Sequence, residues 1–462
     1  MTAPFEIQLV DLDTGKTNRL THWSTYTYIS DLMQAADTFT ATIAPTANQR
    51  AFTAHGGQLA KVFSHGALQS TAITDERSEA ASKSSTDLTV SGRGVGGLLV
   101  DSAVPPSVGY SIAELSLLQI VNKITDPWQP DYITSVVASN DVSRFIAAGG
   151  QSSYSTKSRT ALRVKKDDNG NPVIGKDGKV KRERYLIPGK TSKARYKPFG
   201  KKSPYYRGTG EETQRKTRIE PGEKVWGVIS RLCKMVAAHP FVGCDGALVL
   251  GRPAYDFQPS AYGDGLVLEW NDKQQRATGG NVENVQFETS IAERHSETIV
   301  WGTGKPRKGS MGAEIKRHTW SVKDPCPAFW VRSAASPWVT TNKLYKPDVR
   351  KIKDVANEDL VRRIARGIFE EKVIGAFSLQ YEIAGHHING VLPVVDSMIP
   401  VRDERFGLED AFYITRVERS VSLDRGATTV INVIPPKIWL HFDHDKTGDD
   451  EYLEHMVQRV FW

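Results

Sequence analysis

The strongest constraint on the fold of this 462-residue chain is a series of short segments in which apolar and polar residues alternate. Nine such segments, from FEIQLVDL near the start to TTVINVI near residue 430, show period-two patterning or β-branched enrichment and are bounded by Gly, Pro or Asp. Only three segments have clear helical spacing. Runs of strands interrupted by isolated helices are typical of α+β folds, so we predict a β-rich, multidomain α+β protein and not an alternating βαβ sheet.

The three helical segments carry start and stop signals. Ser111 is followed three residues later by Glu114, which is the pattern of a capping box and predicts a helix that begins at Ser111. A second helix is predicted to have Pro221 near its first turn. The third is predicted from Asn357 to Gly375.

The segment TVSGRGVGGLLVDSAVPP contains Gly92, Gly94 and Gly97 in the spacing G-x-G-x-x-G, which in the right context cradles a dinucleotide pyrophosphate. That site requires a helix that opens at the last glycine, because the helix N-terminus supplies the amide donors. Pro105 and Pro106 stop any helical run within about two turns, so we predict no such helix and no cofactor here.

The positive charge of the chain is concentrated in one segment. Residues 156–218 contain 20 Lys and Arg against 6 Asp and Glu, which gives +14, whereas the rest of the chain carries −7 of the overall net charge of +7. Two Asx-Gly turn signals separate short alternating runs within it, and a stretch with aromatics between lysines follows. We interpret residues 156–218 as a basic arm of one or two ribbon hairpins and an irregular basic tail.

Three interpretations of the basic arm stay open. Its cations can contact an acidic face of a partner protein, or nucleic-acid phosphates with aromatic stacking on bases, or they can be solvated only. The residues predicted for partner contact are Lys165, Lys166, Lys181, Arg182, Arg184, Arg195, Lys197, Lys201 and Lys202.

Neither a metal site nor a disulfide framework is predicted. The three cysteines, Cys233, Cys244 and Cys326, form no C-x-x-C pair and fit a reducing compartment. His386 and His387 are consecutive, and neighbouring residues of a strand face opposite ways, which disfavours a shared ion.

One acidic stretch has partial calcium-loop spacing. The residues from Asp443 to Glu454 place oxygens at positions 1, 3, 5, 7 and 12 of an EF-hand-like loop. Asp450 at position 8 and a strand-like segment in place of the preceding helix count against calcium, and a solvated turn is the alternative. No apolar run approaches membrane-spanning length, and the N-terminus lacks the pattern of a signal peptide, so neither a membrane anchor nor secretion is expected.

The order of these elements resembles that of phage baseplate hub proteins from contractile tails, the phage Mu type, which are related to the hub part of type VI secretion spikes. The resemblance is carried by DLMQAADTFTATIAP, VSGRGVGGLLVDSAVPP, YSIAELSLLQIVNKI, the segment from Ile219 to Pro253, and ERHSETIVWGTG, in that order. In the glycine segment, Arg93, Leu99, Val100 and Asp101 match the family, whereas Gly94 and Ser102 depart from it.

The resemblance implies two tail-tube-like β-barrels with smaller α/β subdomains. We expect a first barrel over residues 1–100 and an α/β subdomain over 101–255, which the basic arm interrupts at about 156–218. A second, discontinuous barrel is expected from 256–320 and 376–436, because neither part is long enough to close a barrel alone. An inserted helical or α+β subdomain is expected over 321–375 and a C-terminal tail over 437–462.

The resemblance also implies a structural, non-enzymatic role. Three copies would form a ring that adapts a hexameric tail tube above to a trimeric spike below, in the baseplate of a virion assembled in the host cytoplasm, with nucleic acid only as contents of the channel. Two alternatives are a nucleic-acid-binding protein that uses the basic arm and a hub-associated cell-wall hydrolase. The carboxylate pairs available for hydrolysis, Glu288/Glu293 and Glu370/Glu371, lie in segments typical of strand and helix surface.

Overall fold

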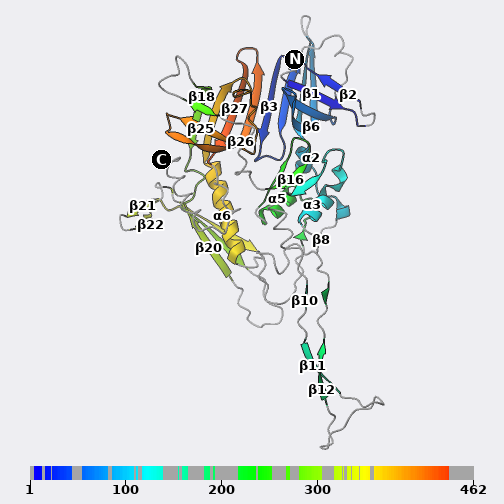
Figure 1. Ribbon diagram of the computed structural model, residues 1–462, viewed down its shortest axis with the longest axis vertical. Helices are drawn as coiled ribbons and strands as arrows, with labels where there is room; N and C mark the ends of the chain where they lie inside the picture. Colours follow the sequence, from blue (N-terminus) through cyan, green and yellow to red (C-terminus); the bar gives the residue numbers. More distant parts are fainter. Residues whose placement is uncertain are drawn as a thin grey trace, which may run out of the picture.

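The computed structural model describes residues 5–12, 16–21, 23–43, 55–81, 86–108, 111–112, 117–138, 154–155, 159–164, 182–187, 191–192, 217–235, 238–251, 267–270, 280–303, 317–324, 326, 330–333, 336–342, 344–353 and 358–435. Within them, one 13-stranded sheet dominates and lies across the top of Figure 1. The described residues confirm the prediction of a β-rich α+β fold. No helix among them is long and apolar enough to cross a lipid bilayer.

The first half of the large sheet comes from the N-terminal part of the chain. Its strands lie in the order β2-β1-β5-β6-β7-β4-β3. Their side chains alternate between buried and partly exposed, as period-two patterning predicts, and the inward ones form one core around Tyr26, Tyr28 and Phe39. The bounds are β1 Phe5–Val10, β2 Thr17–Leu20, β3 Thr25–Asp31, β4 Thr38–Ile43, β5 Leu59–Ser64, β6 Ala67–Ala81 and β7 Thr86–Gly94.

The second half comes from the C-terminal part and has its own core. Its strands lie in the order β18-β24-β27-β26, and β25 extends the sheet from β26 to β17. Leu379, Tyr413 and Ile431 are fully buried members of the core that these strands enclose. The bounds are β17 Leu268–Trp270, β18 Val282–Thr289, β24 Phe377–Ala384, β25 Ser397–Asp403, β26 Leu408–Ser422 and β27 Gly426–Ile434.

One antiparallel ladder joins the two halves. Strand β26 pairs with β3 from Arg416 opposite Asp31 to Val421 opposite Tyr26. Among the described strands, no ladder closes either half into a barrel. In the second half, the side chain of Asn281 links the two ends of the curled sheet: it accepts a hydrogen bond from the Glu269 amide at 3.0 Å and donates one to the Val267 carbonyl at 2.5 Å.

The two halves repeat the same strand plan. In the first half β3, β4, β7, β6 and β5 are neighbours in that order, and in the second half β18, β24, β27, β26 and β25 are. The long strands β6 and β26 both have 15 residues, and β7 and β27 both have nine. Each long strand also has an irregularity in its pairing near the middle, between Thr74 and Glu76 in β6 and between Ile414 and Arg416 in β26. The halves are therefore two copies of one structural unit.

A helical layer covers the first half. Helices α2 (Gly96–Asp101), α3 (Leu117–Thr125) and α5 (Val225–Met235) pack with a small sheet of β15 (His239–Val242), β16 (Leu248–Gly251) and β9 (Val136–Ala138). Leu59 and Ile73 of the large sheet belong to the same buried cluster as the helices. Short 3-10 turns lie at Pro106–Val108 and Asp126–Trp128.

Two predictions about helix starts are wrong. Ser111 is not a helix cap: it lies in β8 (Ser111–Ile112), which pairs with β14 (Thr217–Arg218), and α3 begins at Leu117. Pairing with a distant strand overrides the local capping signal there. The glycine segment, for which we predicted no helix, opens the six-residue α2 at Gly96. The third helix, α6, spans Glu358–Gly375.

Helix α6 covers a separate three-stranded sheet below the second half (Figure 1), which consists of β20 (Arg317–Lys323), β19 (Glu297–Thr303) and β23 (Pro347–Lys353). Val300, Val361 and Ala365 form its small core. A two-stranded ribbon of β21 (Trp330–Ser333) and β22 (Ser336–Asn342) also belongs to this part of the chain.

The predicted domain ranges remain predictions, but the strand pairing bears on one of them. Residues 282–289 pair with 377–384, so parts of the two predicted segments of the second barrel share a sheet. Residues 297–303 and 317–320, which we also placed in that barrel, pair instead within the sheet of β20, β19 and β23.

Candidate interaction surfaces

The outer face of the large sheet carries mainly hydroxyl and amide side chains. They alternate with the core residues along each strand, and the β26–β3 register carries the pattern across both halves, since Ser420 lies opposite Thr27. We call this set the polar face: Thr27, Thr38, Thr40, Thr42, Thr89, Ser91, Asn284, Gln286, Ser378, Gln380, Ser420, Thr428 and Asn432.

Many groups of the polar face bond to one another across or along strands. The hydroxyls of Thr42 and Thr89 are 3.0 Å apart, and those of Ser420 and Thr428 are 2.9 Å apart. Arg416 and Glu418 lie beside them on β26 and form an ion pair at 2.8 Å. The thirteen residues of the polar face include no Lys or Arg, so they supply no cations for phosphates.

A hydrogen-bonded chain crosses the junction between the two halves. The Thr429 hydroxyl donates to the Gly385 carbonyl at 2.8 Å, so it accepts a bond from His386 Nδ1 at 2.9 Å. His386 Nε2 is then the acceptor for the Tyr26 hydroxyl at 2.5 Å. Burial lowers the pKa of His386 to about 4, and the charge of Arg419 adds to this. The imidazole is therefore neutral, and its tautomer is fixed by the two hydroxyls.

Arg419 is the largest buried side chain of the junction. It is 2% exposed, and it donates to Gln69 Oε1 at 2.9 Å and to the Pro393 carbonyl. Its guanidinium carbon lies 5.9 Å from the ring centre of Tyr28. These contacts join β26 of the second half to β3 and β6 of the first.

The partly buried carboxyl of Asp37 lies next to this group. The Tyr28 hydroxyl donates to Asp37 Oδ2 at 2.8 Å. Burial raises the pKa of Tyr28 well above its usual value, and it also raises that of Asp37. Buried polar groups of this kind fix one geometry, because any displacement leaves them without partners.

The paired histidines of the sequence do not share a role. His386 belongs to the hydrogen-bonded chain, whereas the ring of His387 lies against that of His65, with ring centres 4.3 Å apart. In the part of the chain that the structure describes, no three His, Cys, Asp or Glu side chains come together as a metal site. The acidic stretch from Asp443 to Glu454 lies outside the described residues.

The glycines of the G-x-G-x-x-G segment allow close packing. A Cβ atom on Gly96 would lie 1.9 Å from the Ala35 carbonyl oxygen, and one on Gly92 would lie 2.2 Å from that of Ile73. Neighbouring backbone therefore packs directly against these two glycines, and a side chain at either position would clash with it.

Arg93, one of the residues that match the hub family, ties the sheet to helix α2. Its guanidinium lies 2.6 Å from Asp75 Oδ2 and 2.8 Å from Asp101 Oδ2. These two contacts raise the pKa of Arg93 and make it a fixed bridge from β6 and β7 to the helix end.

The basic arm is described only in its paired backbone. Strand β11 (Arg159–Val164) pairs with β12 (Arg182–Ile187), and β10 (Tyr154–Ser155) pairs with β13 (Thr191–Ser192), far from the large sheet in Figure 1. Arg182 lies opposite Val164 and Arg184 opposite Leu162. The other predicted contact residues, Lys165, Lys166, Lys181, Arg195, Lys197, Lys201 and Lys202, lie outside the described residues.

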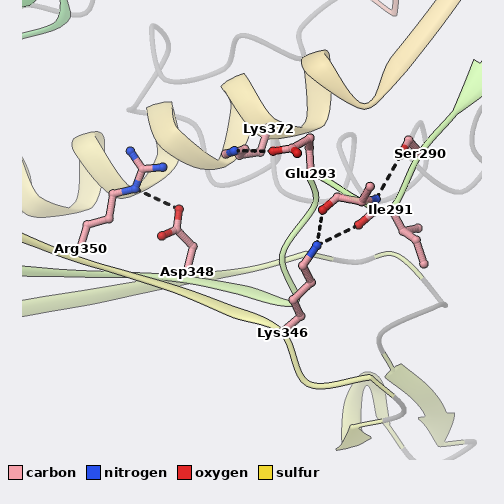
Figure 2. Close-up of polar contacts among 8 residues, drawn as sticks. Ser290, Ile291, Glu293, Lys346, Asp348, Arg350 and Lys372 are labelled. Atoms are coloured by element: carbon pink, nitrogen blue, oxygen red, sulfur yellow. Dashed lines mark hydrogen bonds and ion pairs between the residues drawn. The ribbon is translucent and has the colours of Figure 1, made fainter.

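Helix α6 and the sheet of β20, β19 and β23 together are called the α6 unit, and Figure 2 shows polar contacts between this unit and the chain that follows β18. Lys372 Nζ of α6 lies 3.1 Å from Glu293 Oε2, and Lys346 donates to the carbonyls of Ile291 and Ala292. The contact with Lys372 lowers the pKa of Glu293, so this exposed carboxylate is stabilised in its charged form.

The interaction surfaces were only partly visible in the sequence. The alternation of Thr38, Thr40 and Thr42 with buried Phe39 and Ala41 signals one polar and one apolar face of a strand. The junction gives no such signal, because Tyr26, His386 and Arg419 come from distant segments.

No protein-family model and no curated protein matches the chain. Two solved structures resemble it along nearly their whole length. The tail protein from Neisseria meningitidis MC58 is 21% identical, with a TM-score of 0.63 over 95% of this chain and 98% of that one. The 43 kDa tail protein of prophage MuSo2 from Shewanella oneidensis is 18% identical, with a TM-score of 0.60 over 94% of this chain and 99% of that one. The resemblance inferred from the sequence is confirmed at the level of the fold.

Proposed function

We propose that this chain is the structural baseplate hub of a contractile phage tail. In this role three copies form a ring that adapts a hexameric tail tube to a trimeric spike. The observation that carries the proposal is the repeated half: one chain contains two units of the same strand plan, joined edge to edge by the β26–β3 ladder. The similarity of the fold to that of two tail proteins supports the proposal that the chain belongs to a phage tail.

The symmetry argument follows from the repeat. Three chains with two units each present six similar units around one axis, and a tube ring with six subunits presents six matching positions. A closed ring also covers sheet edges that would otherwise be open to aggregation. A ring built from a chain with a single unit would need six copies. Its surface would repeat six times and would not match the threefold symmetry of the spike.

The polar face suits the inside of such a ring. A channel wall that lets nucleic acid or protein pass must hold neither strongly. Hydroxyl and amide groups that already bond to one another, such as Thr42 with Thr89, meet that need better than unpaired cations do. We place the polar face toward the channel, with the spike on one side of the ring and the tube or its initiator on the other.

The same role sets the location and the chemistry. The protein belongs to the virion baseplate after assembly in the host cytoplasm, it contacts other baseplate proteins, and it turns over no substrate. Imaging of isolated tails at residue resolution tests this: three copies around the axis between tube and spike are expected. Six copies, or a monomer at the periphery of the baseplate, would refute the adapter role.

The basic arm is proposed to dock on an acidic surface of a neighbouring subunit or baseplate protein. An isolated two-stranded ribbon such as β11–β12 is marginally stable in water, so a docked arm gains order in the assembly. Limited proteolysis between Lys157 and Lys216 should be fast in the free protein and slow in tails. Equal rates would contradict docking.

Nucleic-acid binding by the arm is the second candidate, and the +14 charge of residues 156–218 is what favours it. Filter binding with duplex DNA across a salt series separates the two, because phosphate contacts make the affinity fall steeply with salt. Protein docking predicts only weak binding to DNA at physiological salt.

A further inference from the structure

Several strand edges of the large sheet have no partner among the described strands, and two of them, on β6 and β18, concern us here. Strand β6 pairs with β5 along its first part, but beyond Thr74 no described strand pairs with the same edge, and the residues from Asp75 to Ala81 are exposed. Strand β18 pairs with β24 on one side only. Open edges of this kind are templates for pairing with another chain.

The internal repeat indicates which partner fits the β6 edge. Strand β26, the counterpart of β6, pairs with β25 through its first part and with β3 through Arg416–Val421, its last part. Aligned on the irregularity in each long strand, Arg416–Val421 corresponds to Glu76–Ala81. The part of β6 that lacks a partner therefore corresponds to the part of β26 that pairs with the other half.

Strand β18 is the counterpart of β3. Both are the outermost strand of their unit in the repeated plan, and they pair with the corresponding strands β24 and β4. Their inward side chains also correspond: Val285 and Phe287 in β18 take the places of Tyr26 and Tyr28 in β3. Within a chain, β26 pairs with β3. If the repeated plan is followed in both halves, β6 should pair with a β18 strand in the same way.

That β18 cannot come from the same chain. Seven strand spacings of about 4.8 Å separate β6 from β18 along the sheet, or roughly 34 Å, and Figure 1 shows β6 in the first half of the sheet and β18 in the second. The partner strand must belong to a second copy.

We propose that β18 of one copy forms an antiparallel ladder with Glu76–Ala81 of β6 in the next copy. The inference rests on the proposed ring and names the contact that closes it. Transferred from the β26–β3 register, the ladder places Ser78 opposite Glu288 and Ala80 opposite Gln286. Three such ladders between chains alternate with three β26–β3 ladders within chains.

The register agrees with the faces of both strands. Ser78 and Ala80 would continue the polar face beside Glu288 and Gln286, and Arg77, Glu79 and Ala81 would lie on the side of Phe287 and Val285. No two like charges lie directly opposite in this register. The polar face would then run without a break around the ring.

Cysteine cross-linking tests the register. In a Cys244→Ser background, the pair Ser78→Cys and Glu288→Cys should be joined by a short thiol cross-linker, since opposite residues in a ladder have Cβ atoms about 4.5–5.5 Å apart. We expect covalent dimers and trimers, up to three times the 51.2 kDa chain mass. Two control pairs should stay monomeric: Ser78→Cys with Asn284→Cys, which is four residues out of register, and Asn18→Cys with Glu288→Cys, which uses the β2 edge.

Charge reversal tests the same contact without a cross-linker. Ser78→Glu places like charges opposite each other and should weaken trimerisation about two- to five-fold per ladder. Glu288→Lys in the same chain should restore it, and Asn18→Glu on the other edge strand should have no effect. Native mass spectrometry measures the trimer fraction.

The outcomes separate the two proposals. A trimer that forms without the Ser78–Glu288 cross-link overturns the ladder and leaves the proposed hub role standing. A chain that stays monomeric when purified overturns the ladder as a self-assembling contact. A chain absent from the tail axis overturns the hub role itself.

Discussion

The buried arginine of the junction gives the sharpest test of how the two halves are held together. Replacing Arg419 with Met keeps most of the side-chain volume but removes the donors to Gln69 and to the Pro393 carbonyl. An acceptor left unpaired in a buried site costs about 1–3 kcal/mol. Two acceptors are affected, and that of Gln69 is only partly buried, so we expect Arg419→Met to lower the free energy of unfolding by about 2–4 kcal/mol.

A matched control lies on the same strand. Arg416 pairs with Glu418, but both side chains are about one third exposed, and exposed ion pairs contribute about 0–1 kcal/mol. Urea unfolding followed by circular dichroism compares Arg419→Met with Arg416→Met. If both variants lose the same small amount, the junction is not stabilised by buried polar contacts, and the reasoning is refuted.

Two further predictions concern the same architecture. The pKa of His386 is about 4 in the folded protein and about 6.5 in the unfolded chain, so between these values the unfolded state binds one more proton than the folded state. The free energy of unfolding should therefore fall by up to about 3 kcal/mol as the pH drops from about 6.5 to 4. The variant His386→Gln should flatten this pH profile. A profile equally steep in that variant would exclude His386 as the cause. Gly96→Ala places Cβ against the Ala35 carbonyl and should cost about 1–3 kcal/mol, whereas Gly227→Ala in α5, with open space around it, should be neutral or stabilising by up to about 1 kcal/mol. Thermal unfolding of both glycine variants checks this, and equal shifts would contradict the packing argument.

The strands were predictable where one face is buried. The segment FEIQLVDL predicts β1, found at Phe5–Val10, and TTVINVI predicts β27, found at Gly426–Ile434, because burial on one face imposes a period of two. The signals that failed were local ones that distant pairing overrides. Ser111 shows this: its cap pattern is intact, yet it pairs with Arg218 of β14, 107 residues later, and this pairing determines its conformation.

The candidate surfaces were less predictable because they depend on which edges meet. The β26–β3 ladder joins segments almost 400 residues apart, and no residue pattern within either strand specifies the other. The bridge of Arg93 to Asp75 and Asp101 is similar: the resemblance to hub proteins singled out Arg93 and Asp101, but Asp75 becomes a partner only through the β6–β7 ladder.

The two halves share one strand plan but carry different additions, and this difference gives the proposed ring its threefold character. The helical layer follows β7 in the first half, whereas the α6 unit is inserted between β18 and β24 in the second. Around a ring of three copies, six similar sheets would face the channel, and two kinds of addition would alternate outside it. A surface formed by the sheets alone matches a sixfold tube, and one formed by the additions repeats only three times, as a trimeric spike requires. Sequence divergence between the halves follows from the same geometry, because each half of the chain would then contact different neighbours while keeping the strand edges that close the ring.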